Sequence, residues 1–158
     1  MILEKIREKF LDDVCEAHEF RGDLVVIVHK EVIRDLIKFL KVDPSLDFNI
    51  LMDLTAVDYL GQARKPRFDV VYHLYSLQKN HRLRVKAGVD EKEPVIDSLT
   101  PIWPIADWFE REVWDMFGIK FKGHPNLKRI LMYEKFQGHP LRKDYPLNKR
   151  QPLIGPAI

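Results

Sequence analysis

Three consecutive segments with a two-residue period constrain the fold of this chain more than any other feature. Apolar and polar residues alternate over 47–54, 68–74 and 82–89. The last segment is the most regular, with Leu83, Val85, Ala87 and Val89 alternating with Arg82, Arg84 and Lys86. Successive side chains of a strand point to opposite faces, so each predicted strand has one face on a core and one toward water. Short turn-rich links at 61–66 and 78–80 favour antiparallel neighbours.

Segments with a helical period surround these predicted strands. Apolar residues recur at helical spacing over 2–19, 30–41 and about 105–116, and the last of these predicted helices ends at Gly118. The apolar run at 24–28 is typical of a buried strand. The order helix–strand–helix–three strands–helix predicts an α/β (α+β) two-layer sandwich. We expect a four-stranded mixed sheet with the helices on one face.

The charge of the chain divides near residue 118. Residues 118–158 hold nine Lys and Arg against two Asp and Glu, a net charge of +7, and the whole chain carries +2, so residues 1–117 carry −5. From residue 119 the sequence has five Pro and three Gly and little periodicity. We therefore predict a body domain at 1–118 and an extended basic arm at 119–158 that wraps a partner. Aliphatic residues among the arm's charges favour a protein partner.

Composition excludes several classes of protein. A hydrophobic fraction of 46% and a charged fraction of 32% are ordinary for a globular protein. No apolar run approaches the ~20 residues of a membrane-spanning helix, and the first residues do not form a secretory signal. The single cysteine, Cys15, makes neither an internal disulfide nor an iron–sulfur or structural zinc site. We expect it on the buried face of the first helix.

Two Gly-His-Pro triplets, at 123–125 and 138–140, make His124 and His139 candidate metal ligands. Two imidazoles do not complete a tetrahedral site, and the flanking residues add only Glu134 and Asp144 as carboxylates. We therefore expect each histidine to make a hydrogen bond or a stacking contact, and we predict no metal site.

The acidic residues near 110 are weak candidates for catalysis. Glu110 and Glu112 lie roughly 200° apart on a helix, which is poor geometry for two carboxylates that share a substrate. Arg111 and Asp115 have the spacing of a helix ion pair. The sequence contains neither a glycine-rich phosphate loop nor a nucleophile elbow. We predict no catalytic residue and no cofactor site in this chain.

Nucleic-acid binding is an alternative of a different class. The outward row Arg82, Arg84 and Lys86 and the basic arm could contact phosphates. The acidic body and the apolar residues of the arm favour a protein partner instead. Salt dependence separates the two, because phosphate binding weakens steeply with salt whereas a large apolar interface does not.

The segment 110–147 resembles a known family. It contains Glu110-Arg-Glu-x-x-Asp115-Met-Phe-Gly-Ile, the first Gly-His-Pro with Arg129-Ile-Leu, and Gly138-His-Pro-Leu-Arg-Lys-Asp-Tyr-Pro146. Upstream, the stretches at 53–59 and 70–74 also match. The sequence resembles the 30 kDa subunit family of respiratory complex I, the NADH–quinone oxidoreductase, over roughly residues 46–147.

The resemblance implies a peripheral-arm subunit on the cytoplasmic face of a bacterial or archaeal inner membrane, without a membrane span of its own. The lack of a presequence before Met1 favours that origin over a mitochondrial one. NADH, FMN, iron–sulfur clusters and quinone would belong to the complex, and this chain would support the 49 kDa-type quinone-site subunit and other peripheral-arm subunits. The equivalent subunit of a membrane-bound hydrogenase or another dehydrogenase complex is the alternative. The predicted partner interface comprises Glu110, Arg111, Asp115, His124, Arg129, His139, Arg142, Lys143, Asp144 and Tyr145.

Overall fold

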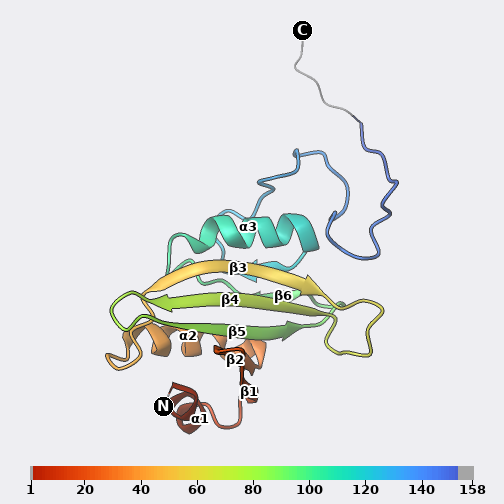
Figure 1. The fold of residues 1–158 in the computed structure, drawn as a ribbon. Helices are drawn as coiled ribbons and strands as arrows, with labels where there is room; N and C mark the ends of the chain where they lie inside the picture. The colour runs from red at the N-terminus through yellow and green to blue at the C-terminus, as the bar shows by residue number, and fades with distance from the viewer. Residues whose placement is uncertain (1, 153–158) are drawn as a thin grey trace.

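The computed structural model describes residues 2–152 (Figure 1). The N-terminal half contains α1 (Ile2–Lys9), β1 (Val14–Phe20), β2 (Asp23–Val28), a 3₁₀ turn (Lys30–Val32) and α2 (Ile33–Val42). There follow β3 (Ile50–Asp58), β4 (Phe68–Ser76), β5 (His81–Val89), β6 (Val95–Asp97), α3 (Ala106–Phe117) and β7 (Lys120–Lys122). None of the helices within residues 2–152 is long and apolar enough to cross a membrane.

The central sheet has five strands in the order β1-β2-β5-β4-β3. Strands β3, β4 and β5 are antiparallel neighbours, as the short links predict, whereas β2 pairs with β5 in parallel. The sheet is therefore mixed, and the predicted α/β class is confirmed. The predicted number of strands is wrong, because β1 adds a fifth. Two short strands that the sequence did not indicate, β6 and β7, form a separate parallel pair.

The hydrophobic core lies on one face of the sheet. Ile6 of α1, Leu36 of α2 and Val113 of α3 belong to one cluster with the inward residues of the strands, including Tyr72 and Val85. Figure 1 shows α3 along the β3 edge of the sheet and α2 toward the β5 edge. The helices thus share one face, as expected, and the opposite face carries the outward row of β5.

The first predicted helix is too long. Helix α1 ends at Lys9, and residues 14–20 form β1, which pairs antiparallel with β2. Arg21 and Gly22, with φ of 53° and 86°, form the two-residue turn between the strands. Pairing with β2 supplies the backbone hydrogen bonds that a helix would otherwise make. Cys15 consequently lies exposed on β1, and its expected place in the core is wrong.

Strand β3 departs from simple alternation. The register with β4 shifts between Leu51 and Asp53, which is the signature of a β-bulge. The bulge turns Leu51 inward together with Leu54, while Ile50 and Met52 are exposed. The sequence predicted Ile50 and Met52 on the same face as Leu54, and the inserted residue explains the difference.

Candidate partner interface

Helix α3 organises the segment that follows it through a buried carboxylate. The Asp115 side chain is fully buried. Its Oδ2 accepts hydrogen bonds from the backbone N–H groups of Ile130, Leu131 and Met132 at 2.9–3.1 Å. Its Oδ1 pairs with the Arg129 guanidinium at 2.6 Å. Burial alone would raise the pKa of Asp115, but these donors together lower it below its ordinary value.

Arg129 and His139 close the same segment into a loop. Arg129 Nη2 donates to the carbonyl oxygens of Phe136, at 2.7 Å, and Gly138, at 3.0 Å. His139 Nδ1 donates to the backbone oxygen of Asp115 at 3.0 Å, and its ring meets Trp114 edge-on. Burial lowers the pKa of His139, which favours the neutral ring. The loop is therefore attached to α3 at both ends.

A second cluster attaches the end of the segment to the sheet. Arg67, which is buried, binds Asp58 through two hydrogen bonds of 2.8–2.9 Å. It also pairs with Asp144 at 2.8 Å and with Glu91. Asp58 Oδ2 accepts the Lys143 N–H at 2.9 Å. Burial opposes ionisation of Asp58, but Arg67 and the N–H groups outweigh it and lower its pKa to about 2.

Glu110 joins α3 to the loop after β6. Its carboxylate accepts hydrogen bonds from Ser98 Oγ and the Leu99 N–H, both at 2.6 Å, and it is fully buried. Burial raises the pKa of Glu110 to about 7, and the two hydrogen bonds only partly offset that effect. Glu110 and Asp115 thus both face the interior of this chain.

The histidine of the first Gly-His-Pro triplet is bound through both ring nitrogens. His124 Nε2 donates to the backbone oxygen of Asp107 at 3.1 Å, and Nδ1 accepts the Asn126 N–H at 3.0 Å. Within residues 2–152 no group of three or more His, Cys, Asp or Glu is arranged to hold a metal ion. The arrangement fits the hydrogen-bonding role that the sequence favoured.

The remaining predicted interface residues also make contacts within the chain. Arg111 donates to the backbone oxygens of Lys128 and Arg129, so its expected pairing with Asp115 is wrong. The Arg142 guanidinium lies 5.2 Å from the centre of the Phe68 ring, and Tyr145 stacks on Phe136. No sequence pattern indicated these contacts, because the partners lie far apart along the chain. Contact of the ten residues with another subunit stays a prediction, as do the domain limits.

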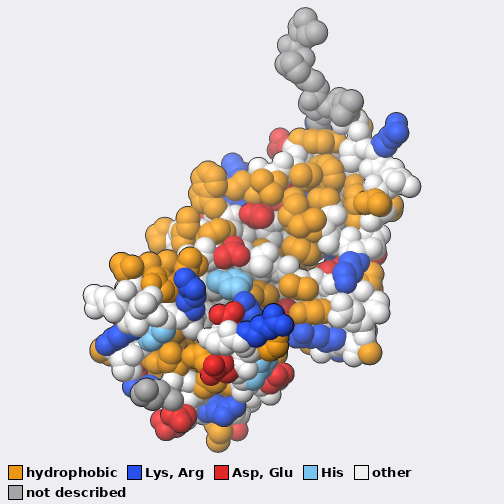
Figure 2. All heavy atoms as spheres, in the orientation of Figure 1, with side chains coloured by type: hydrophobic (Ala, Val, Ile, Leu, Met, Phe, Trp, Pro, Cys, Tyr) orange, Lys and Arg blue, Asp and Glu red, His pale blue; other side chains and the backbone are white. Residues whose placement is uncertain are grey.

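The surface of this region is rich in exposed apolar side chains. Trp108 on α3 is 62% exposed, and Leu131 and Leu141 on the following segment are 57% and 55% exposed. Ile105 and Leu147 are exposed as well. Figure 2 shows hydrophobic side chains gathered over α3 and the segment after it. We call Ile105, Trp108, Leu131, Leu141 and Leu147 the apolar surface. Sequence reasoning favoured the charged residues and missed it.

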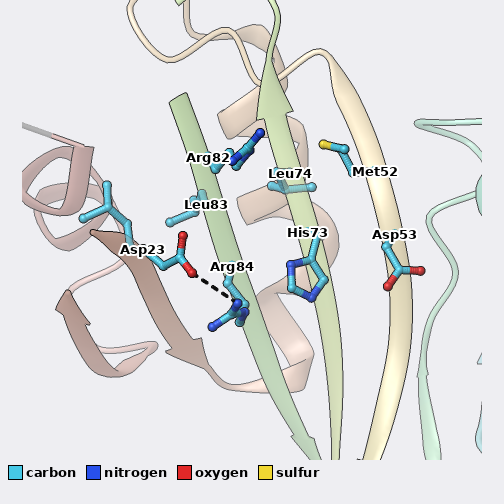
Figure 3. A pocket seen from close by; sticks show the side chains of 9 residues that line it. Asp23, Met52, Asp53, His73, Leu74, Arg82, Leu83 and Arg84 are labelled. Carbon is cyan, nitrogen blue, oxygen red and sulfur yellow. Dashed lines mark ion pairs between the residues drawn. The ribbon is translucent and has the colours of Figure 1, made fainter. Parts of the chain in front are cut away.

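The uncovered face of the sheet carries alternating charges. Figure 3 shows Arg84, His73 and Asp53 side by side on β5, β4 and β3, in a shallow hollow of about 380 Å³. Arg84 pairs with Asp23 of β2 at 3.5 Å. The carboxylates among these bases make a continuous phosphate-binding stripe unfavourable, which weakens the nucleic-acid alternative.

Comparison with known proteins identifies related chains. The family model described as "Respiratory-chain NADH dehydrogenase, 30 Kd subunit" matches residues 26–151. The C subunit of NADH-quinone oxidoreductase from Roseiflexus sp. (strain RS-1) is 53% identical over 150 residues, which cover 95% of this chain and 85% of the relative. The corresponding protein of Geobacter sulfurreducens is 48% identical over 153 residues, or 96% of this chain and 93% of the relative.

Two solved structures are also similar. The trypsin-resistant fragment (1-134) of Nqo5 has a TM-score of 0.70 and 34% identity, covering 80% of this chain and 96% of the fragment. A chain of the membrane-bound sulfane sulfur reductase, an archaeal respiratory membrane complex, has a TM-score of 0.77 and 26% identity. That match covers 93% of this chain and 85% of the other.

Proposed function

Since the chain belongs to the 30 kDa subunit family of respiratory-chain NADH dehydrogenase and is part of an NADH–quinone oxidoreductase complex, we propose that its role there is structural. It carries no cofactor and supports the neighbouring 49 kDa-type subunit, which reduces quinone. It works on the cytoplasmic face of a bacterial or archaeal inner membrane, among the peripheral-arm subunits. NADH, FMN and the iron–sulfur clusters are bound elsewhere in the complex.

The apolar surface is the observation that carries this proposal. Exposed aromatic and aliphatic side chains in one region mark a site of protein association. Asp115, Arg129 and Asp144 are paired within the chain, so their charges shape the segment and leave its aliphatic side chains for the partner. A large aromatic such as Trp108 is the usual kind of anchor at such an interface.

The chemistry of the described residues supports the absence of a cofactor. The ring nitrogens of His124 are both engaged, and the buried carboxylates of Asp58 and Asp115 are occupied by backbone and arginine donors. Glu110 is a titratable group with a raised pKa, but it is enclosed between α3 and the loop after β6. These groups therefore serve to position the backbone.

The archaeal sulfane sulfur reductase favours a second candidate, the equivalent subunit of another respiratory membrane complex. Its chain shares the fold over most of its length but only 26% of its residues with this one. The bacterial relatives named above share about twice that fraction, and both are subunits of NADH-quinone oxidoreductase. The NADH–quinone branch is therefore preferred.

Substitution of the apolar surface tests the proposal. We expect Leu141→Asp to reduce co-purification of the 49 kDa-type subunit by about tenfold or more, because a buried charge replaces an apolar contact. The matched control is Leu77→Asp, since Leu77 is 65% exposed on the β4–β5 hairpin. Neither variant should change the melting temperature of the isolated chain. Equal retention of the partner by both variants would contradict the proposal.

A further inference from the structure

Arginines and lysines have different places on α3 and the segment after it. Arg111 donates to backbone oxygens, Arg129 pairs with Asp115, and Arg142 lies over a buried aromatic ring. Four lysines of the same segment are exposed, and none of their ammonium groups pairs with a carboxylate of residues 2–152. We call these four residues the lysine rim: Lys128, Lys135, Lys143 and Lys149. The arginines thus shape the segment, and the more strongly hydrated lysines face its surroundings.

The carboxylates of this segment do not neutralise the lysine rim. Only Glu134 and Asp144 lie between residues 128 and 149. Asp144 is already bound by Arg67 at 2.8 Å, so Glu134 alone remains to face four lysines. In the body, by contrast, cations such as Lys5 and Arg84 pair with carboxylates of the chain itself. The segment therefore exposes an excess of positive charge.

The lysine rim is interleaved with the apolar surface. Lys128, Lys143 and Lys149 each lie within three positions of an exposed leucine that belongs to that surface. Figure 1 shows the segment extending from α3 away from the sheet, so the acidic body does not lie over it. Apolar side chains among exposed polar ones are the usual anatomy of a protein interface, with a dry centre and a wet rim.

We propose that the partner face which covers the apolar surface is acidic, and that the lysine rim steers this face into place during association. The inference rests on the proposed function and adds the chemistry of the partner, namely Asp and Glu side chains around an apolar patch. Exposed lysines attract such a face from a distance but contribute little after docking, because their charges stay hydrated. The lysine rim thus sets the association rate, and the apolar surface sets the dissociation rate.

The kinetics of binding between the full-length chain and the 49 kDa-type subunit, measured by biolayer interferometry, test this division. The triple variant Lys128→Glu, Lys135→Glu and Lys143→Glu should associate about tenfold or more slowly in about 50 mM salt. Its dissociation rate should change by less than about threefold. Salt at about 0.5 M should remove most of the difference, because it screens charges that are not in contact. Leu141→Asp should have the opposite effect and mainly speed dissociation.

The matched control reverses three exposed lysines of the body, with Lys38→Glu, Lys79→Glu and Lys92→Glu. It has the same net charge as the rim variant, so it separates the position of the charges from their sum. It should associate within about threefold of the wild-type rate. Glutamine at the three rim positions should slow association to an intermediate degree, which also provides a test if the glutamate variant does not fold. Equal slowing by both triple reversals, or a wild-type rate for both the glutamine and the glutamate rim variants, would overturn the proposal.

Phosphatidylglycerol vesicles test a lipid surface as the other source of negative charge. We expect no saturable binding of the full-length chain to these vesicles at about 0.15 M salt. Vesicle binding that the rim reversal abolishes, together with an unchanged rate of association with the 49 kDa-type subunit, would assign the lysines to a membrane and overturn the proposal. If the wild-type chain did not bind the subunit at all, the result would instead contradict the proposed function.

Discussion

At the scale of residues, three buried carboxylates fix irregular backbone, and two of them, Asp58 and Asp115, act on the C-terminal segment. Asp115 holds residues 130–132, Asp58 holds Lys143 through its N–H, and Glu110 holds Leu99. Each carboxylate accepts donors that could not otherwise be satisfied away from water. The segment therefore follows one path without a helix or a long strand of its own.

Removal of Asp115 should destabilise the chain strongly. Asp115→Ala leaves three backbone N–H groups and the half-buried Arg129 without their acceptor. Breaking such a pair costs on the order of 3–5 kcal/mol of unfolding free energy. Urea denaturation measures the loss, and Glu112→Ala, at an exposed position of the same helix, should stay within about 0.5 kcal/mol of wild type. Similar effects of the two substitutions would show that Asp115 does not anchor the segment.

Glu110 should make stability fall as pH rises from about 4.5 to about 7. Its pKa is about 7 in the folded chain against an ordinary value of 4.5. Between these values the folded state keeps a proton that the unfolded state has released, so unfolding becomes easier as pH rises. The wild type should lose on the order of 3 kcal/mol from this group across that interval, with little further loss above it.

Glu110→Gln isolates this effect, because the amide is neutral at every pH. We expect the difference in unfolding free energy between variant and wild type to shift in favour of the variant by that amount between pH 4 and pH 8. Urea midpoints at several pH values measure it. His73 and His139, whose pKa values are lowered by burial, affect both proteins equally. A difference that is constant with pH would refute the assignment.

At the scale of elements, periodicity predicted most of the body correctly. The strands near 24–28, 68–74 and 83–89 and the helices near 30–41 and 105–116 are present, because their apolar residues face one shared core. Strand β1 was missed, and with it the hairpin that β1 forms with β2. The apolar residues of 2–14 fit a helical spacing, so the predicted helix ran on into β1. The Arg21-Gly22 turn was the available signal.

The candidate site was less predictable than the fold. Sequence indicated the segment but not its contacts, because Arg67 meets Asp144 across 77 positions and Asp58 meets Lys143 across 85. A one-dimensional pattern carries no information about such pairs. The lack of periodicity from residue 119 predicted an extended arm, and hydrogen bonds to buried carboxylates attach part of that segment to the body.

The C-terminal end of α3 gives a test at this scale. Gly118 ends the helix with φ of 79°, and a Cβ there would lie 2.7–2.8 Å from the His139 ring. We expect Gly118→Ala to lower the unfolding free energy by about 2 kcal/mol or more, through backbone strain together with displacement of His139. Chemical denaturation measures the change.

Gly22→Ala is the matched control for that substitution. Gly22 has φ of 86°, but nothing lies within 4 Å of a Cβ placed there. It should therefore show only the smaller cost of a left-handed backbone, about 1 kcal/mol. Equal losses at the two glycines would mean that the contact between His139 and the helix end contributes nothing.

At the scale of the whole molecule, the sheet separates two surfaces with different properties. One side carries the core, α3 and the apolar surface, and the other carries the charged outer row with its shallow hollow. Residues 118–158 carry a net charge of +7, and some of these positive charges make contacts within the chain. Arg129 pairs with Asp115, and Arg142 lies over the Phe68 ring. We therefore assign docking of the partner subunit to the apolar surface, whose backbone is held in place by buried charged residues such as Asp115.

Photo-crosslinking in the assembled complex tests this central claim most directly. A benzoylphenylalanine at position 108 replaces an exposed tryptophan, and the same residue at position 77 is the control on the β4–β5 hairpin. We predict a crosslinked product with the 49 kDa-type subunit from position 108 and none from position 77. A product from position 77 alone, or none from position 108 in an intact complex, would contradict the assignment of docking to the apolar surface.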